Sequence, residues 1–329
     1  PMDITGKPFA QDQFAAVAAA RRHATAVEHD GRRISYAELD ERANQLAHRL
    51  ESLGVGRGSV VMTHLERSIE LIVSFLAILK AGAGYLPVEP GVPDDRIATC
   101  VKETNCVAVV THVGGEGRFG HLPVPTITPD SGGTADVPAG PPTAGVGPTD
   151  IAYVIYTSGS SGAPKAVQVN HASLGYLCAR VNERYRIGPD DRVLQFAALS
   201  FDTSIEQILA ALLNGATLVL PEYNWAPSEL PGRLVSLGVT VMDLTPPYWR
   251  AFLAELARTP VELPVRLTIV GGSAVHAEDC RTALRLMPGS RLVNAYGLTE
   301  TTITSCTMEI TPDVLPAQGP APVGRPLPQ

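Results

Sequence analysis

The chain has 329 residues, of which 45% are hydrophobic and 18% are charged, which fits a globular protein and excludes disorder of the whole chain. The formal net charge of −7, without a basic tract, argues against a surface for nucleic acid. Five scattered cysteines without a CxxC pair favour reduced thiols in a cytoplasmic protein over zinc or disulfides. The longest apolar run, 71–79, is far shorter than the roughly 18 to 20 residues that cross a membrane, so we expect no membrane segment.

Helical and strand-like segments alternate along the first half of the chain. Apolar residues from Leu39 to Leu50 recur at three- and four-residue spacing and predict an amphipathic helix that ends at Gly54. Ser68 can cap a second helix, whose nearly continuous apolar side chains predict that it is buried. For this half we expect helices over 36–53 and 69–81 and strands over 59–64, 106–111 and 152–157.

The second half repeats this alternation. We expect helices over 203–213, 228–236, 246–257 and 276–287 and strands over 216–220, 239–243, 266–271 and 291–296. Strands that alternate with helices predict an α/β fold with mostly parallel, doubly wound sheets, of which we expect two. Residues 129–149, rich in Pro, Gly, Ala and Thr, predict a flexible connector.

Three polar or glycine-rich turns follow predicted strands, where ligands bind in sheets of this kind. They are YTSGSSGAPK (156–165), GGSA (271–274) and AYGLTE (295–300). In the first turn, glycines let backbone N–H groups approach a phosphate, hydroxyls add donors and the lysine adds positive charge. The turn does not match GxxxxGK[ST], and a serine- and glycine-rich turn without a ligand is the alternative. The candidate phosphate-binding residues are Thr157, Ser158, Gly159, Ser160, Ser161, Gly162 and Lys165.

The first turn resembles the phosphate loop of the adenylate-forming superfamily, which includes the adenylation domains of nonribosomal peptide synthetases, acyl-CoA synthetases and luciferases. Further segments resemble the core motifs of the adenylation domains in the same order, and they span nearly the whole chain. These segments are ISYAEL (34–39), LKAGAGYLPVEP (79–90), FDTS (201–204), NAYGLTE (294–300) and PVGRP (322–326). Ala166, Leu298 and Glu89 depart from the usual Gly, Pro and Asp without putting any motif in doubt.

The resemblance implies an N-terminal core of two stacked, doubly wound sheets flanked by helices. We expect a first α/β subdomain over about 8–190 and a second over 191–329. The chain ends before the family's ribose-binding Asp, before a terminal β-barrel part and before the small C-terminal subdomain with the catalytic Lys. We therefore expect this core by itself to bind nucleotide weakly and to adenylate slowly.

The reaction that the resemblance implies joins a carboxylate to the α-phosphate of ATP and releases pyrophosphate. Residues 157–165 would hold the departing phosphates, Thr299 would contact the α-phosphate and Glu300 would help to hold Mg²⁺. Tyr296 would stack on adenine, which Asn294 and the backbone of 272–274 would border. With Lys165, Thr299 and Glu300 as catalytic residues, the remaining residues expected at ATP are Gly272, Ser273, Ala274, Asn294, Ala295, Tyr296 and Gly297.

For the second substrate, the resemblance places Asp202 at the α-ammonium group of an amino acid, although an Asp here can also cap the following helix. Acyl-CoA synthetases lack this Asp. The expected pocket residues are Asp202, Thr203, Glu206, Leu244, Ile269, Gly271, Ala295, Ile303 and Thr304. Apart from Asp202, Glu206 is the only carboxylate in this set, and the other side chains are small or aliphatic. A carboxylate at this position favours a basic or donor-rich substrate. A small polar substrate such as cysteine or threonine, and a Glu206 that points to solvent, remain open.

Alternatives of other classes are an acyl- or aryl-CoA synthetase and a non-catalytic fragment that binds nucleotide or amino acid. The resemblance implies that the aminoacyl adenylate passes to the phosphopantetheine thiol of a carrier protein, and it leaves a small helper protein open as a further partner.

Overall fold

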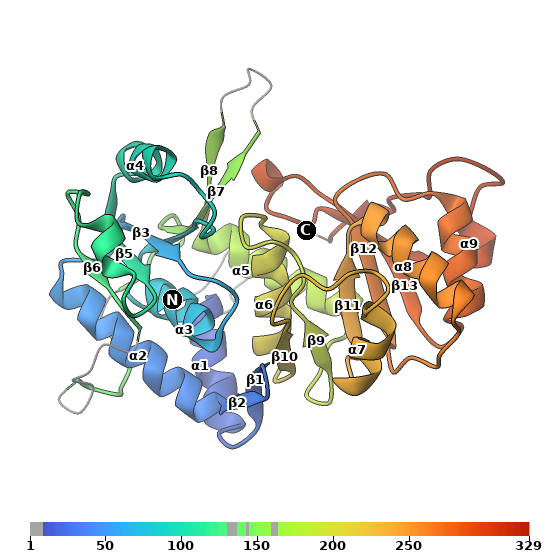
Figure 1. Cartoon of the computed structure of the whole chain (residues 1–329), viewed down its shortest axis with the longest axis horizontal. Helices are drawn as coiled ribbons and strands as arrows, with labels where there is room; N and C mark the ends of the chain where they lie inside the picture. Colours follow the sequence, from blue (N-terminus) through green and yellow to red (C-terminus); the bar gives the residue numbers. More distant parts are fainter. Residues whose placement is uncertain (1–8, 130–136, 143–144, 159–163, 329) are drawn as a thin grey trace. The chain divides into compact units, whose positions relative to one another are not determined.

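The computed structural model describes residues 9–129, 137–142, 145–158 and 164–328, and the chain divides into two compact units. The first unit comprises residues 1–27, 32–176 and 199–202, and the second comprises 28–31, 177–198 and 203–329 (Figure 1). The main change of unit lies within α5 (His171–Tyr185), whereas the sequence placed the division near residue 190.

The first unit is built on a six-stranded sheet with the order β6-β5-β3-β4-β7-β8. All neighbouring strands are parallel except the last pair, β7 and β8, which is antiparallel. The strands are β3 (Val60–His64), β4 (Gly84–Pro87), β5 (Cys106–Thr111), β6 (Thr126–Ile127), β7 (Ile151–Thr157) and β8 (Lys165–Asn170).

The two helices predicted in this unit are confirmed, with caps that explain where they begin. The hydroxyl of Ser68 accepts a hydrogen bond from the backbone of Leu71, and that of Ser35 accepts one from Glu38. Every residue of α3 except Glu70 is buried, as the apolar sequence predicted. The helices are α1 (Ala10–Ala20), α2 (Tyr36–Ser52), α3 (Ile69–Lys80), α4 (Asp94–Glu103) and the 3₁₀ turn η1 (Glu116–Phe119).

The second unit is built on the larger sheet, which has nine strands in the order β15-β14-β13-β12-β11-β9-β10-β1-β2. Its centre is parallel from β10 to β13, and β14 and β15 add antiparallel strands. The strands are β1 (Thr25–His29), β2 (Arg32–Ser35), β9 (Arg192–Leu194), β10 (Thr217–Leu220), β11 (Val241–Leu244), β12 (Leu267–Gly271), β13 (Arg291–Tyr296), β14 (Cys306–Ile310) and β15 (Arg325–Pro326).

The strand order of this sheet reverses at β9, because the chain moves from β9 outward to β10 and then returns past β9 to β11. Right-handed crossovers in opposite directions place their helices on opposite faces of a sheet. The helix between β9 and β10 therefore covers one face, and those before β11, β12 and β13 cover the other. They are α6 (Thr203–Leu212), α7 (Leu230–Ser236), α8 (Pro246–Arg258) and α9 (Ala277–Leu286), followed by the 3₁₀ turns η3 (Thr299–Thr301) and η4 (Pro312–Val314).

The alternation of side chains along β11 separates these two faces. Met242 and Leu244 belong to the buried cluster that includes Trp249 of α8 and Cys280 of α9. Asp243 lies between them in the chain and lines a cavity under α6 on the other face. The Met242 and Leu244 side chains of β11 thus face the apolar cluster, and the Asp243 carboxyl lies on the other face.

Only part of the predicted connector over 129–149 can be compared with the structure, because residues 130–136 and 143–144 lie outside the described residues. The described part contains neither helix nor strand. The carbonyl of Ala139 accepts a hydrogen bond from Nδ2 of Asn44, and that of Gly140 is bonded to Nε2 of His48. These two bonds attach the described part of the segment to α2.

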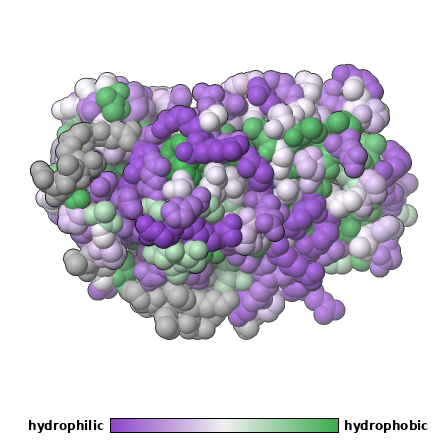
Figure 2. Space-filling model, turned by 90° about the horizontal axis from the view of Figure 1, so that it is seen from below, coloured by the Kyte–Doolittle hydropathy of each residue, from purple (hydrophilic) through white to green (hydrophobic). Residues whose placement is uncertain are grey.

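Hydrophilic residues cover much of the face shown in Figure 2, between smaller hydrophobic areas. In the part of the chain that the structure describes, no helix combines the length and the apolar character needed to cross a membrane. All five cysteines are free thiols.

Candidate functional site

The predicted phosphate loop lies in the first unit, between the antiparallel strands β7 and β8. Thr157, the last residue of β7, is paired with Lys165, the first residue of β8. Ser158 and Lys165 are both exposed. Gly159, Ser160, Ser161 and Gly162 lie outside the described residues. The sequence had treated the whole of 156–165 as a turn, whereas Lys165 begins a strand whose position depends on its pairing with β7.

The predicted adenine and metal residues follow β13 in the second unit. The ring of Tyr296 is 46% exposed at the end of this strand, and Glu300 is exposed in η3 beside the half-buried Thr299. Asn294 is buried instead, and its side-chain amide donates a hydrogen bond of 2.9 Å to the carbonyl of Pro322. Tyr296, Thr299 and Glu300 are therefore accessible, and Asn294 supports the neighbouring chain segment.

The turn that carries Thr299 and Glu300 is closed tightly. The backbone of Ser305 donates to the carbonyl of Tyr296 at 2.8 Å. A Cβ on Gly297 would lie 1.6 Å from the carbonyl oxygen of Ile303, so only glycine fits there. Ile303 and its neighbour Thr302 have positive φ angles of 61° and 65°, which is unusual for β-branched residues. Such strain persists where the surrounding structure imposes it, often at functional sites.

Two further predicted residues meet across neighbouring strands. Gly271, at the end of β12, is paired with Ala295 of β13, and a Cβ on Gly271 would lie 2.4 Å from the carbonyl oxygen of Ala295. Gly272, Ser273 and Ala274 follow in an exposed turn. The predicted ends of β12 and β13 therefore lie side by side at one edge of the sheet.

The predicted substrate residues around α6 are mostly buried. Asp202, immediately before the helix, is 7% exposed, and Glu206 in its first turn is 4% exposed. Thr203, the first residue of the helix, is half-buried. The burial of Glu206 contradicts the alternative that this carboxylate points to solvent.

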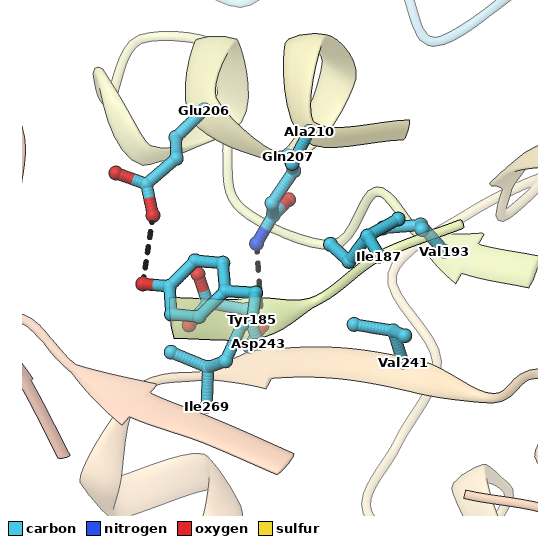
Figure 3. A pocket seen from close by; sticks show the side chains of 9 residues that line it. All are labelled: Tyr185, Ile187, Val193, Glu206, Gln207, Ala210, Val241, Asp243 and Ile269. Carbon is cyan, nitrogen blue, oxygen red and sulfur yellow. Dashed lines mark hydrogen bonds between the residues drawn. The ribbon is translucent and has the colours of Figure 1, made fainter. Parts of the chain in front are cut away.

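Glu206 lines a small cavity between α6 and the strands, with room on the order of one water molecule (Figure 3). The hydroxyl of Tyr185, the last residue of α5, donates a hydrogen bond of 3.0 Å to Oε1 of Glu206. Nε2 of Gln207 donates at 3.3 Å to the backbone carbonyl of Asp243. The lining residues are Tyr185, Ile187, Val193, Glu206, Gln207, Ala210, Val241, Asp243 and Ile269.

The cavity joins two of the predicted pocket residues, Glu206 and Ile269, and leaves others apart from it. Leu244 packs in the apolar cluster on the opposite face of the sheet. Ile303 and Thr304 are buried in the turn after β13 and are not among the lining residues. The sequence analysis missed Tyr185 and Asp243. The alternation of strand β11 was the available signal for Asp243, since a residue next to a core Leu faces the other side.

The two groups that sequence analysis missed have perturbed acidities. Loss of hydration raises the pKa of Asp243 to about 7. Burial, followed by the charges of Glu206 and Asp243, raises the pKa of Tyr185 well above its usual value. Tyr185 therefore keeps its proton and acts as a hydrogen-bond donor, and Asp243 changes its charge near neutral pH.

Among the described residues, no group of three or more His, Cys, Asp or Glu side chains is arranged to hold a metal ion. Glu300 offers a single accessible carboxylate. This fits Mg²⁺ only as an ion held jointly with substrate phosphates, because Mg²⁺ commonly binds through one or two carboxylates, phosphate oxygens and water.

Comparison with known families places the chain among nucleotide-using enzymes. The sequence profile of the family described as "AMP-binding enzyme" matches residues 14–329. The isonitrile lipopeptide synthase of Streptomyces coeruleorubidus is 38% identical over 320 residues, which cover 94% of this chain and 22% of that protein. The phosphinothricin tripeptide synthetase PhsC of Streptomyces viridochromogenes is 38% identical over 317 residues, covering 94% and 28%. The chain thus spans less than a third of either relative.

Solved structures of the nonribosomal peptide synthetase FmoA3 (S1046A) have the same fold. The form bound to alpha-methyl-L-serine-AMP has a TM-score of 0.88 and 30% identity, and the match covers 97% of this chain and 36% of that one. The AMPPNP-bound form has a TM-score of 0.86 and 29% identity, covering 97% and 34%. These matches agree with the predicted α/β architecture of mostly parallel sheets flanked by helices.

Proposed function

This chain belongs to the family of AMP-binding enzymes, and we propose that it activates the carboxylate of an α-amino acid as aminoacyl-AMP, with ATP consumed and pyrophosphate released. Support comes from its similarity to peptide synthetases along almost the whole chain. Membership of the family supports adenylate formation, but it does not identify the acid that is activated. The proposal adds that this acid is an α-amino acid.

The observation that carries the choice of an amino acid is the buried carboxylate of Asp202 directly before α6. Burial makes a carboxylate costly unless charge and hydrogen bonds offset the loss of water. The α-ammonium group of an amino acid offers both, with three N–H donors and a positive charge. We therefore assign Asp202 to this group.

In the proposed reaction, a carboxylate oxygen of the amino acid attacks the α-phosphorus of ATP, and the bond from this phosphorus to the oxygen that bridges to the β-phosphate breaks. Both reactants are anions, so neutralising charge and orienting the groups carry the catalysis. Lys165 and the hydroxyls of Thr157 and Ser158 bind the departing phosphates, and Thr299 binds the α-phosphate. Tyr296 stacks on adenine. Mg²⁺ held by Glu300 and the phosphates would supply further positive charge.

For the amino-acid side chain, the buried carboxylate of Glu206 supports a basic or polar group. A cationic side chain gives it an opposite charge, and a small side chain with a hydroxyl or thiol gives it a donor. The aminoacyl group would then pass to a phosphopantetheine thiol on a carrier protein, as the similarity to peptide synthetases suggests, and a small helper protein is an optional further partner.

The test is ATP–pyrophosphate exchange with a panel of basic, polar, aliphatic and aromatic amino acids. We expect exchange that depends on ATP and on one group of amino acids, with basic or small polar members preferred. A strong preference for aliphatic amino acids would contradict the assignment of Glu206. Exchange with no amino acid at all, together with no binding of a non-hydrolysable aminoacyl adenylate analogue, would contradict the proposed function.

The alternative within the family is activation of a fatty or aryl acid. Analogues that keep the side chain and lack the α-amine distinguish the two, because they cannot use the charge of Asp202. We expect these analogues to be poor substrates of the parent, and Asp202→Ala to lose most of its preference for the amine. Equal turnover of both forms would favour the alternative.

A further inference from the structure

A short segment of the chain belongs to the first unit although it lies between stretches of the second. Residues 199–202 are part of the first unit, and the residues on either side of them are part of the second. This segment carries Asp202, which we assigned to the α-ammonium group of the amino acid. Leu199 at its start is buried, but Phe201 is 64% exposed, so burial of apolar side chains holds the start of the segment more than its end. Polar contacts near its centre therefore bear on where Asp202 lies.

Such a contact comes from Glu89, which follows β4 in the first unit. Oε1 of Glu89 accepts a hydrogen bond of 3.2 Å from the backbone N–H of Ser200 and one of 3.0 Å from the Ser200 hydroxyl. Hydrogen bonds to a carboxylate are stronger than those between neutral groups, and these two restrain both the backbone and the side chain of Ser200. Because Ser200 stands two residues before Asp202, the contact restricts the backbone that carries the Asp202 carboxylate.

The loop that carries Glu89 is itself held in place. Before Glu89, the backbone N–H of Val88 donates to the carbonyl of Thr63 at 2.9 Å and continues the pairing of β4 with β3. After it, the backbone N–H of Val92 donates to the carbonyl of Glu89 at 3.1 Å. Nη2 of Arg118 donates to the carbonyl of Val92 at 2.9 Å. A loop held at these points presents the Glu89 side chain from a fixed backbone.

The charge of Glu89 has a basic neighbour in the same unit. Burial lowers the pKa of the half-buried Arg67 guanidinium, and the negative charge of Glu89 opposes this shift. Attraction to Arg67 offsets part of the cost of bringing a half-buried carboxylate to Ser200. A carboxylate only accepts hydrogen bonds, so it matches the two donors that Ser200 offers.

We propose that Glu89 is a positioning residue that acts through Ser200 and holds the Asp202 carboxylate where it binds the α-ammonium group of the amino acid. This inference rests on the proposed function and deepens it, because it extends recognition of the α-amine to a residue in a distant part of the chain. It also gives a role to the position at which LKAGAGYLPVEP departs from the usual Asp.

The test compares two non-hydrolysable adenylate analogues that differ only in the α-amine. They are glycyl sulfamoyl adenosine and acetyl sulfamoyl adenosine, and neither has a side chain, so the result does not depend on which amino acid the protein activates. Titration calorimetry on the full chain gives the ratio of the two dissociation constants. We expect the parent to bind the glycyl form about thirtyfold more tightly, because its amine is a charged donor to Asp202.

Glu89→Ala removes the acceptor of both Ser200 hydrogen bonds. We expect it to lower this ratio about tenfold, while affinity for the acetyl form changes less than twofold, because the acetyl form has no amine for Asp202 to bind. Glu89→Gln keeps an acceptor oxygen at the same distance and should retain the ratio within about threefold. Glu66→Ala, at an exposed glutamate of the same unit, is the matched control and should leave the ratio unchanged.

Ser200→Ala tests the other side of the contact. It removes the hydrogen bond of the hydroxyl and keeps that of the backbone, so we expect the ratio to fall by about threefold. In the Glu89→Ala background the same substitution should have no further effect, because both residues act through one contact. This small substitution keeps the test decisive if Glu89→Ala does not fold.

A Glu89→Ala variant that folds and keeps the parental ratio would overturn the inference. Equal loss of affinity for both analogues, or a Ser200→Ala effect that is undiminished in the Glu89→Ala background, would also overturn it, because Glu89 would then have a general structural role. A parent that binds both analogues equally would overturn the assignment of Asp202 as well, and a parent that binds neither would overturn the proposed adenylation.

Discussion

The hydroxyl of Tyr156 donates a hydrogen bond of 2.8 Å to Oε2 of Glu103, and thereby ties the base of the predicted phosphate loop to helix α4. The guanidinium of Arg96, about two helical turns before Glu103 in α4, lies 4.6 Å from the centre of the Tyr156 ring. Tyr156 of β7 is paired with Ala166 of β8, so its side chain links α4 to the strand pair that flanks the loop.

Tyr156→Phe should therefore weaken ATP binding without unfolding the protein. Losing a hydrogen bond to a carboxylate in this position should raise the dissociation constant of ATP with Mg²⁺ by about three- to tenfold. Titration calorimetry measures this change. Lys102→Gln, an exposed position on the same helix, is the control and should bind as the parent does. Unchanged affinity in Tyr156→Phe would show that the tie to α4 does not position Thr157 and Lys165.

Gly297→Ala should displace the turn that carries Thr299 and Glu300. The added Cβ would meet the carbonyl oxygen of Ile303 at 1.6 Å, so the backbone must shift. Misplacement of catalytic groups by about 1 Å can reduce turnover about a hundredfold, and we expect a loss of this size in ATP–pyrophosphate exchange.

The matched control for this change is Gly289→Ala, where a Cβ meets no atom within 4 Å. It should retain the parent rate, and circular dichroism should show that both variants keep the parental helix content. A Gly297→Ala variant with the parent rate would mean that this turn does not hold reacting groups.

His171 should make the protein sensitive to mild acid. Its ring is 1% exposed, and burial lowers its pKa from 6.5 to about 4. The unfolded chain therefore binds this proton at a higher pH than the folded chain. The contribution of the neutral His171 ring to the free energy of unfolding is fully present above pH 6.5. Up to about 3 kcal/mol of it is lost as the pH falls toward 4.

His171→Leu should remove this part of the pH dependence. Urea unfolding at pH 7.5 and pH 4.5 measures the free energy of unfolding in each state, and the difference between the two pH values should be smaller in the variant than in the parent. His23→Gln, at an exposed histidine, should keep the parental difference. The same difference in His171→Leu and the parent would contradict the prediction.

Asp243→Asn should stabilise the protein at alkaline pH. The pKa of this carboxyl is raised from 3.8 to about 7 by loss of hydration, so the folded state keeps a proton that the unfolded state releases at lower pH. The contribution of the Asp243 carboxyl to the free energy of unfolding is complete below pH 3.8 and is lost as the pH rises through 7. We expect the variant to gain on the order of 2 kcal/mol over the parent at pH 8 and almost nothing at pH 4.

Unfolding by urea at these two pH values checks the prediction. Asp94→Asn is the control, because the Asp94 carboxylate forms an ion pair with Arg118 at the surface. If Asp243→Asn is equally destabilised at both pH values, the substitution has removed a structural contact. That result would contradict the prediction that the ionised carboxylate destabilises the folded protein at alkaline pH.

Elements with one dominant apolar pattern were predictable from the sequence. The strand over 106–111 and the buried helix after Ser68 are confirmed, because their side chains are apolar in the chain itself. Strand β8 and helix α5 were not predicted. Half of the residues of β8 are exposed and only one is buried, so residues 165–170 carry no local pattern that predicts a strand. The strand forms because it pairs with β7.

The sequence by itself determined the class of chemistry, because the glycine- and hydroxyl-rich loop, Asp202 and Glu300 belong to motifs whose order along the chain is specific. The tertiary structure decided which side chains share the cavity. Tyr185 and Glu206 are 21 residues apart and meet only because the fold brings the last residue of α5 beside the first turn of α6. The cavity contains Asp243 and excludes Leu244, because neighbouring residues in a strand face opposite sides and the reversal of strand order at β9 sets which side α6 covers.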